Sequence, residues 1–351
     1  MIRFATIGTS GICELFCEAL ACCGNARLVA TYSRDLARAR AFGERFGAAL
    51  FFDSLEELAC CKEVDAVYIA SPNALHAPQA LQMIASGKHV LVEKPFASNE
   101  SEAREVFDAA RKAGLVALEA TRSLHVPTFD VIERVVRCEL GPVRLATLRF
   151  SKVTSRMARL RAAERINVFD SHLSGGALMD IGVYCVEPAI ALFGRPNSIR
   201  ALALTSPVPG CSEDDPCGVV DLCGEALLGY DDKIVSLSYG KTSDDVLASQ
   251  VEGERATLTW EPISGPIELR LFEHEDKGQV FRVEGASGAP LEVDVPQNDM
   301  VCEIEDFVSA VLGSEEALAK RERFEGVTLD SLSVMDEIRR QIGVRFPTDP
   351  S

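Results

Sequence analysis

Gly8-Thr9-Ser10-Gly11 lies between the apolar run from Ile2 to Ile7 and an apolar stretch of helical pattern that starts at Ile12. A strand, a tight glycine turn and a helix in this order form a cradle for phosphate groups. Glycine tolerates positive φ, and the free N–H groups of a helix start attract anions. We therefore predict that a nucleotide cofactor binds at Gly8, Thr9, Ser10, Gly11 and Ile12. The turn departs from G-x-G-x-x-G at Ser10 and Cys13, so an ordinary strand–helix turn is the alternative.

The first 120 residues alternate between predicted strands and predicted helices. Most strand candidates are near-continuous apolar runs, as in a parallel sheet that is covered on both faces. The strand candidates are Arg3–Ile7, Arg27–Ser33, Ala66–Ala70, His89–Val92 and Leu115–Glu119. The helix candidates are Ile12–Cys22, Leu36–Phe46, Leu55–Ala59, Ala77–Ser86 and Ser101–Ala113. This alternation predicts an α/β domain with a doubly wound parallel sheet over residues 1–120.

Polar or turn residues follow several of these strands. The carboxyl ends of parallel strands meet at one edge of the sheet, which is where such sheets bind ligands. We therefore expect a shared site from Gly8, Ser33, Ser71, Pro72, Asn73, His76, Glu93 and Lys94.

The pattern changes after about residue 120, and we predict a second domain over residues 121–351. Helical patterns cover Thr128–Cys138 and residues 176–193, and Val143–Ser151 is a predicted strand. The later strand candidates are Ile199–Leu204, Val219–Tyr230, Ile234–Tyr239, Val246–Glu252, Ala256–Trp260, Ile267–Phe272 and Gln279–Val283. They predict a large, open, mainly antiparallel sheet. Two helices, Met300–Leu312 and Leu329–Gln341, close the chain, and we expect the last to pack back on the first domain.

The charge of the chain excludes some classes of partner. With 36 Lys and Arg against 53 Asp and Glu, the net charge is −17. Nucleic acids and anionic membranes need a basic face, so we expect neither as a partner. No apolar run reaches the roughly 18 residues of a membrane-spanning helix. The first strand begins at Ile2 and leaves no room for a signal peptide, so we expect a cytoplasmic protein.

The twelve cysteines do not form a metal-binding pattern. There is no C-x-x-C. Cys211, Cys217 and Cys223 are evenly spaced, but no His or second Cys pair lies beside them in the sequence, as a zinc site needs. We predict no metal site and expect reduced thiols that pack as small apolar side chains.

Lys94 is a candidate catalytic residue. It follows the apolar strand His89–Val92 and precedes Pro95, which fixes φ in this turn. From a strand end it could hydrogen-bond a substrate hydroxyl or donate a proton to a developing alkoxide. The alternative is an ordinary surface lysine.

Asp180 and Tyr184 form a second candidate pair. They are four residues apart in an otherwise apolar helical stretch that follows Gly175-Gly176, so they share one helix face. A buried carboxylate and phenol need partners. Facing a cleft, the phenol could donate a proton and the carboxylate could orient a hydroxyl. A helix cap and a tyrosine with its hydroxyl at the surface are the alternative.

Ser33-Arg34 bears on the choice of cofactor. Dinucleotide domains often place an acid after the second strand to bind the ribose 2′-hydroxyl, whereas a Ser-Arg pair suits a 2′-phosphate. Arg38, one turn into the next helix, could add to it. Asp35 either caps that helix or contacts the ribose. We therefore predict NADP as the preferred cofactor and NAD as the alternative.

His76, His125 and His172 are each individually typical of structural roles, although His76 could contact the nicotinamide ribose or the substrate. Arg122 and His125 lie just beyond the fifth predicted strand. The segment 151–174 is expected to line the pocket. Its four arginines could bind an anionic substrate or face solvent; they are Arg156, Arg159, Arg161 and Arg165.

Taken together, these motifs resemble the Gfo/Idh/MocA family, the glucose–fructose oxidoreductase and inositol dehydrogenase group. The resemblance rests on Ile7–Ile12, Ser33-Arg34-Asp35, Ser71-Pro72-Asn73 with His76, Glu93-Lys94-Pro95, and Gly176–Tyr184. It implies an N-terminal Rossmann domain and a C-terminal α/β domain whose open sheet forms a dimer or higher oligomer. It also implies catalytic roles for Lys94, Asp180 and Tyr184. Tyrosine rather than histidine at 184 is similar to the dihydrodiol and xylose dehydrogenase branch, which often has Ser-Arg after the second strand.

The sequence thus predicts an NAD(P)-dependent oxidoreductase that acts on a sugar, polyol or related hydroxy or carbonyl compound. Hydride passes between a substrate carbon and the nicotinamide, while Tyr184 or Lys94 handles the hydroxyl proton. Two alternatives stay open: a non-catalytic nucleotide-binding regulator of the same fold, and a lyase or glycosidase that uses bound NAD internally.

Overall fold

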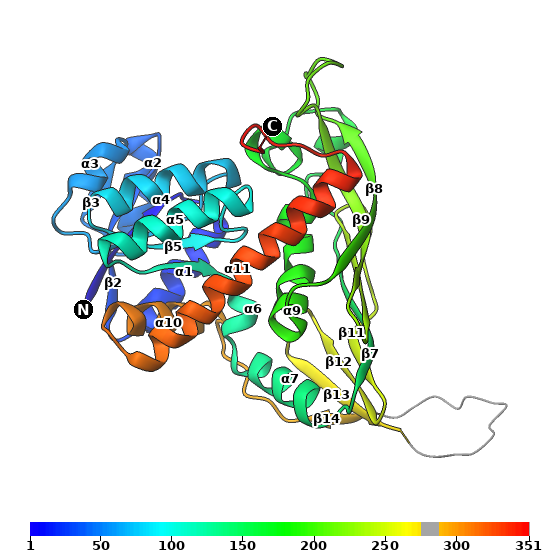
Figure 1. The fold of residues 1–351 in the computed structure, drawn as a ribbon. Coiled ribbons are helices and arrows are strands. Elements are labelled where there is room, and N and C mark those ends of the chain that lie inside the picture. Colours follow the sequence, from blue (N-terminus) through cyan, green and yellow to red (C-terminus); the bar gives the residue numbers. More distant parts are fainter. Residues whose placement is uncertain (275–287, 351) are drawn as a thin grey trace, which may run out of the picture.

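The computed structural model describes residues 1–274 and 288–350 and contains two sheets. The first has six parallel strands in the order β3-β2-β1-β4-β5-β6. The second has eight strands in the order β14-β13-β12-β11-β7-β10-β9-β8. Figure 1 shows the first sheet with its helices beside the long, curved second sheet. The predicted fold class, a doubly wound parallel sheet followed by an open, mainly antiparallel one, is confirmed.

The first sheet is the Rossmann arrangement, and its strands are mostly fully buried. Their bounds are β1 Ile2–Ile7, β2 Ala26–Tyr32, β3 Leu50–Phe52, β4 Ala66–Ile69, β5 His89–Glu93 and β6 Ala117–Ala120. The helices between them are α1 Gly11–Cys22, α2 Leu36–Arg45, α3 Leu55–Cys60, α4 His76–Ala85 and α5 Glu100–Ala113. Strand β3 was missed from the sequence because it has only three residues. All five predicted helices are present.

The second sheet is antiparallel except for one pair, because β7 and β10 run parallel. Its strands are β7 Val143–Ser151, β8 Ser198–Pro207, β9 Val219–Gly229, β10 Ile234–Gly240, β11 Ser249–Gly253, β12 Ala256–Glu261, β13 Glu268–Glu273 and β14 Ala289–Leu291. The predicted strand Gln279–Val283 lies outside the described residues. Strand β11 begins at Ser249, three residues after the predicted start at Val246. Val246 and Leu247 are exposed and lie before the strand.

Helices cover one face of the second sheet. A helix that begins as the π-helical turn Leu178–Gly182 and continues as α9, Val183–Phe193, packs on β7 and β10. This part of the chain also contains the helices α6 Arg122–His125, α7 Pro127–Cys138 and α8 Met157–Arg161 and the single-turn 3₁₀ segments Asn167–Phe169 and Ser171–Leu173. A further 3₁₀ turn, Asn73–Leu75, lies between β4 and α4 in the first part.

The long helix α11, Glu315–Ile342, lies between the two sheets (Figure 1). It contacts α5 and β6 on one side and α9 and β8 on the other, and α10, Met300–Val311, packs on α1. The last helix therefore packs against elements of the first sheet. Its start was misplaced at Leu329, because the first half has a polar pattern; Ser314 caps the true start by accepting from Ala317 N–H. The division of the chain near residue 120 stays a prediction.

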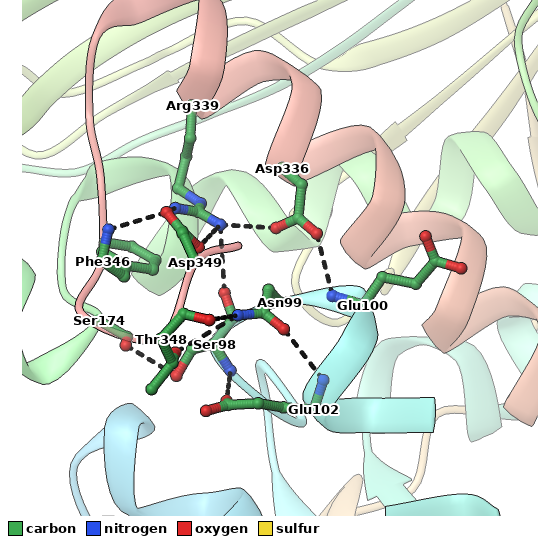
Figure 2. Close-up of polar contacts among 10 residues, drawn as sticks. All are labelled: Ser98, Asn99, Glu100, Glu102, Ser174, Asp336, Arg339, Phe346, Thr348 and Asp349. Atoms are coloured by element: carbon green, nitrogen blue, oxygen red, sulfur yellow. Dashed lines mark hydrogen bonds and ion pairs between the residues drawn. The ribbon is translucent and has the colours of Figure 1, made fainter. Parts of the chain in front are cut away.

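Arg339, near the end of α11, links the C-terminal segment to the turn after β5 (Figure 2). Its side chain is buried, and the residue is only 2% exposed. Its guanidinium donates to Asp336, to Asp349 and to the Ser98 carbonyl. Beside it, Asn99 donates to the Thr348 carbonyl at 3.0 Å. The Ser174 hydroxyl donates to Ser98 at 2.8 Å. This network fixes the turn after β5 against the loop that precedes α9.

Candidate active site

The glycine turn forms the expected cradle at the start of α1. Gly8 has φ +125°, and a Cβ there would lie 2.8 Å from the Ala70 carbonyl oxygen, so the turn needs glycine to pass the end of β4. Ser10 occupies the N-cap but gives no side-chain cap, and its hydroxyl lies 3.6 Å from Cys13 Sγ. The first N–H groups of α1 are therefore left for a ligand. A Cβ on Gly11 would meet nothing within 4 Å, so the space in front is open.

The residues after β2 lie next to this cradle because β2 is the neighbour of β1. Asp35 caps α2 by accepting from Ala37 N–H and Arg38 N–H. Asp35 therefore caps the helix, as one of the two interpretations predicts, through its Oδ1 atom. Arg34 and Arg38 are exposed, and neither forms an ion pair with another described residue. Ser33, Arg34 and Arg38 line none of the described cavities.

His76 holds two strand ends together. Its Nδ1 lies 2.9 Å from the Pro95 carbonyl oxygen and its Nε2 lies 2.9 Å from the Ser71 carbonyl oxygen. Burial lowers the pKa of His76, which favours the neutral ring. The neutral ring carries one N–H and donates it to one of the two carbonyls, while its other nitrogen only lies against the second carbonyl. Its imidazole forms part of the cavity wall. Asn73 makes a second link, since its amide donates to the Ser174 carbonyl at 2.8 Å.

Glu93 lies at the end of β5 and accepts from the Tyr68 hydroxyl at 2.5 Å. Burial raises the pKa of Glu93, against the opposing effects of Lys94 and Tyr68. The next residue, Lys94, leaves the strand through a cis peptide bond to Pro95.

Lys94, Asp180 and Tyr184 meet at one point. The Lys94 ammonium donates to the Asp180 carbonyl at 2.8 Å and lies 3.9 Å from Asp180 Oδ1. It also lies 4.7 Å from the centre of the Tyr184 ring, which is a cation–π contact. The π-helical turn carries Asp180, a form of helix that is frequent at functional sites. Lys241, which follows β10, forms a close ion pair with the other oxygen of Asp180.

Burial and charge oppose each other at these three groups. Burial would raise the pKa of Asp180, but Lys94 and Lys241 together lower it below its usual value. Burial would lower the pKa of Lys94, but Tyr184, Asp180, Glu93 and Glu187 raise it well above its usual value. Burial raises the pKa of Tyr184, and the charges of Lys94 and Arg122 act against this rise. Lys94 is therefore a permanent cation, and Tyr184 is a neutral phenol near neutral pH.

Two cavities meet at this cluster. One, of about 460 Å³, is lined by Ser10, Ile12, Ala70, Ser71, Pro72, Asn73, His76, Glu93 and the loop residues Asn167, Val168, Leu173 and Gly175. The other, of about 550 Å³, is lined by residues after β7, by Arg122, Lys241 and Ser264. Both are lined by Lys94, Arg156, Val168, Asp180 and Tyr184. A larger cavity of about 980 Å³ lies away from Lys94, between α11 and the loop before β8.

The structure places two lysines in the lining of the second cavity that were not predicted as site residues from the sequence. Lys152 follows β7 and Lys241 follows β10, and these strands are parallel neighbours. The prediction of an antiparallel sheet gave no reason to place the two lysines together. Of the four arginines in the segment 151–174, Arg156 lines both cavities. Arg159 and Arg165 are paired with Glu164 and Asp170.

Two of the histidines lie outside the cluster. His125 faces away and pairs with Asp306 at 2.6 Å, a structural contact. His172 lies between Asp170 and Asp215, and its ring is 4.0 Å from Cys211 Sγ. The fold thus brings His172 beside Cys211, although the two residues are remote from each other in the sequence. All twelve cysteines are free.

Comparison with known proteins agrees with this arrangement. Residues 2–121 match the model of the oxidoreductase family with an NAD-binding Rossmann fold, and residues 131–259 match the Gfo/Idh/MocA C-terminal domain. The chain belongs to the Gfo/Idh/MocA family. It is 36% identical over 99% of both chains to scyllo-inositol 2-dehydrogenase (NADP⁺) of Bacillus subtilis. It is 35% identical to the trans-1,2-dihydrobenzene-1,2-diol dehydrogenase of Mus musculus, over 92% of this chain and 91% of that one.

A solved structure shows the same fold for this Gfo/Idh/MocA chain. It is a 3-ketoreductase from Actinomadura kijaniata in complex with NADP and TDP-benzene, with TM-score 0.79 and 24% identity over 99% of both chains. The predicted family is confirmed, and the chain is an NAD(P)-dependent oxidoreductase with an NAD(P)-binding Rossmann domain. Among the described residues, no helix is long and apolar enough to cross a membrane.

Proposed function

We propose that this oxidoreductase transfers a hydride between nicotinamide and a sugar, a polyol or a related hydroxy or carbonyl compound. The observation that carries the proposal is the position of Lys94, Asp180 and Tyr184, which line both cavities. One cavity adjoins the glycine cradle and the other opens on the second sheet. A reacting carbon between them would touch groups from both.

The residues of the first cavity fit a dinucleotide. The glycine cradle leaves the N–H groups at the start of α1 uncapped, which suits a pyrophosphate. We propose that Gly8, Thr9, Ser10, Gly11 and Ile12 hold this part, and that Ser71, Pro72, Asn73, Glu93 and Lys94 line the nicotinamide end. Arg34 and Arg38, exposed beside Ser33, suit a 2′-phosphate. When bound, the cofactor supplies the hydride acceptor or donor.

Each residue of the cluster then has one task. In oxidation the substrate C–H bond breaks and its electron pair leaves with the hydride, while the hydroxyl proton moves to the phenolate form of Tyr184. In reduction the neutral phenol gives this proton to the substrate oxygen. Lys94 stays protonated, hydrogen-bonds the substrate oxygen and favours negative charge on it. Asp180, held by Lys94 and Lys241, fixes the ammonium of Lys94 in place. A regulator without catalysis has no use for such a set of proton-transferring groups.

We expect NADPH to bind more tightly than NADH, because Arg34 and Arg38 can pair with the 2′-phosphate. Replacing Arg34 with alanine should weaken NADPH binding about 10- to 100-fold, the usual range for a lost charged hydrogen bond. It should leave NADH binding nearly unchanged. Isothermal titration calorimetry with both cofactors measures this directly.

Arg40→Ala is the matched control, because Arg40 lies on α2, the helix that follows Arg34, and pairs with Glu44. Equal affinities for the two cofactors, unaffected by Arg34→Ala, would refute the NADP preference. Binding of neither cofactor would refute the proposed reaction. Tight cofactor binding with no redox turnover of any hydroxy compound would favour the regulator or the lyase.

A cytoplasmic location stays a prediction.

We also propose a homodimer or higher homo-oligomer that forms through the open face of the second sheet. The helices cover the other face, and the open one carries large apolar side chains. These are Leu145, Leu202, Leu204, Leu227 and Ile234, each between 47% and 82% exposed. Apolar patches of this kind are typical of interfaces.

Leu227→Glu should shift the protein to the monomer, because it places a charge among the exposed apolar side chains of that face. Light scattering coupled to size-exclusion chromatography measures the mass. Leu312→Glu, at the end of α10 and also largely exposed, should leave the mass unchanged. A wild-type monomer at all concentrations would contradict the proposal.

A further inference from the structure

The second cavity is strongly basic in a chain that is strongly acidic. Its lining contains the basic side chains Lys94, Arg122, Lys152, Arg156 and Lys241. Asp180 is the one acidic residue that lines it among the described part of the chain. The net charge of the whole protein is −17, so this concentration of positive charge runs against the overall composition.

The ion pairs of these side chains do not balance all of the positive charge. Asp180 is shared by Lys94 and Lys241 and can balance only one of them. Arg122 has its own partner, Asp299, at 3.3 Å. Within residues 1–274 and 288–350, neither Lys152 nor Arg156 forms an ion pair. The surplus is therefore concentrated on Lys152, Arg156 and the Lys94–Lys241 pair.

The backbone fixes where the surplus lies. Lys152 N–H donates to the Gly240 carbonyl and Thr154 N–H donates to the Lys241 carbonyl, both at 2.9 Å. These bonds continue the parallel β7–β10 pair beyond its end and bring Lys152 next to Lys241. Arg156 follows directly, with its N–H on the Thr154 hydroxyl. Lys152, Arg156 and Lys241 thus lie on neighbouring segments that line the cavity, together with Lys94 and Tyr184.

We propose that the substrate is an anionic polyhydroxy compound, a sugar or polyol with a carboxylate or phosphate group, which Lys152, Arg156 and Lys241 bind. This rests on the proposed function, since it adds the charge of the substrate to the hydride transfer. The anionic group binds at the wall after β7, and the hydroxyl that reacts lies at Tyr184. A neutral sugar would leave the surplus charge of this wall without a partner.

Matched pairs of substrates test the proposal by turnover. D-glucose is compared with D-glucuronate and D-glucose 6-phosphate, and scyllo-inositol with an inositol monophosphate, by following NADPH formation. We expect kcat/KM to be at least about 10-fold higher for the anionic member, as one added charged hydrogen bond predicts. The carboxylate and phosphate arms show which anion is preferred. Equal values for neutral and anionic members would overturn the proposal.

Variants separate substrate charge from other effects. Lys152→Met and Arg156→Met should raise KM for the anionic compound about 10-fold each, and should raise it more than KM for the neutral member of the same pair. Arg161→Met is the control, because Arg161 is in the same segment but does not line the cavity. No change in KM for either variant would count against the proposal.

A binding measurement keeps the inference testable when none of these compounds is turned over. With the protein saturated by NADPH, calorimetry compares inorganic phosphate, D-glucuronate and scyllo-inositol. We expect the two anions to bind, and we expect Lys152→Met to weaken their binding. Absence of anion binding overturns the inference. Failure of NADPH itself to bind is a different result, because it refutes the proposed function.

Discussion

Replacing Lys94 with methionine is expected to reduce turnover by about 10²- to 10⁴-fold, the range for losing a group that assists proton transfer. Methionine keeps the length of the side chain but removes the charge that touches both Asp180 and the Tyr184 ring. Asp180 still pairs with Lys241, so we expect the fold to be kept. Calorimetry with NADPH should show near-normal affinity, so that the loss is in kcat.

The same change should shift the pH profile to higher pH. Lys94 opposes the rise that burial causes in the pKa of Tyr184. Without this cation the pKa rises further, so the phenol loses its proton at higher pH. The pH at which oxidation reaches half its maximum should increase accordingly. A profile unchanged in position would show that Lys94 does not act on Tyr184.

Lys88→Met is the matched control for a buried lysine. Lys88 donates to the Cys61 and Val64 carbonyls. It lines neither of the two cavities at Lys94. Its replacement should lower the melting temperature but leave kcat per folded molecule unchanged. If Lys94→Met behaves in the same way, its role is structural.

The sequence was sufficient for the parts of the fold and site that depend on local pattern. Apolar runs ending in Gly8, Ser71 and Lys94 indicated parallel strands, and parallel strands bring their carboxyl ends to one edge. The spacing of Asp180 and Tyr184 indicated a shared helix face. Both inferences need only periodicity, and the structure does bring Lys94 to this pair.

The rest depends on pairings that local pattern does not encode. Lys241 meets Asp180 and lies beside Lys152 only because β7 and β10 are parallel within a mainly antiparallel sheet. His76 is a similar case, because its two nitrogens lie beside carbonyls on different loops. A histidine near a predicted cleft suggests ligand contact, but the positions of those two carbonyls follow from the tertiary structure alone.

Tyr184→Phe should cause the second large loss, again about 10²- to 10⁴-fold in kcat. The change removes one hydroxyl and keeps the ring, which packs edge-on against Phe150 at 5.6 Å and under Lys94. Cofactor affinity and melting temperature should therefore be nearly unchanged. Because burial raises the pKa of Tyr184 above its ordinary value of about 10, wild-type oxidation should keep rising at alkaline pH. This rise should be absent from the variant.

Tyr239→Phe provides the contrast, since Tyr239 is also buried on an element of the site, β10, but its hydroxyl has no hydrogen-bond partner within residues 1–274 and 288–350. Removing an unsatisfied buried hydroxyl costs nothing in hydrogen bonds and should keep or raise stability. Its kcat should equal that of the wild type. The comparison isolates the chemistry of one phenol from the packing of an aromatic ring. Equal activity of both variants would mean that the proton of the substrate hydroxyl goes elsewhere, and Tyr184 would lose its assigned role.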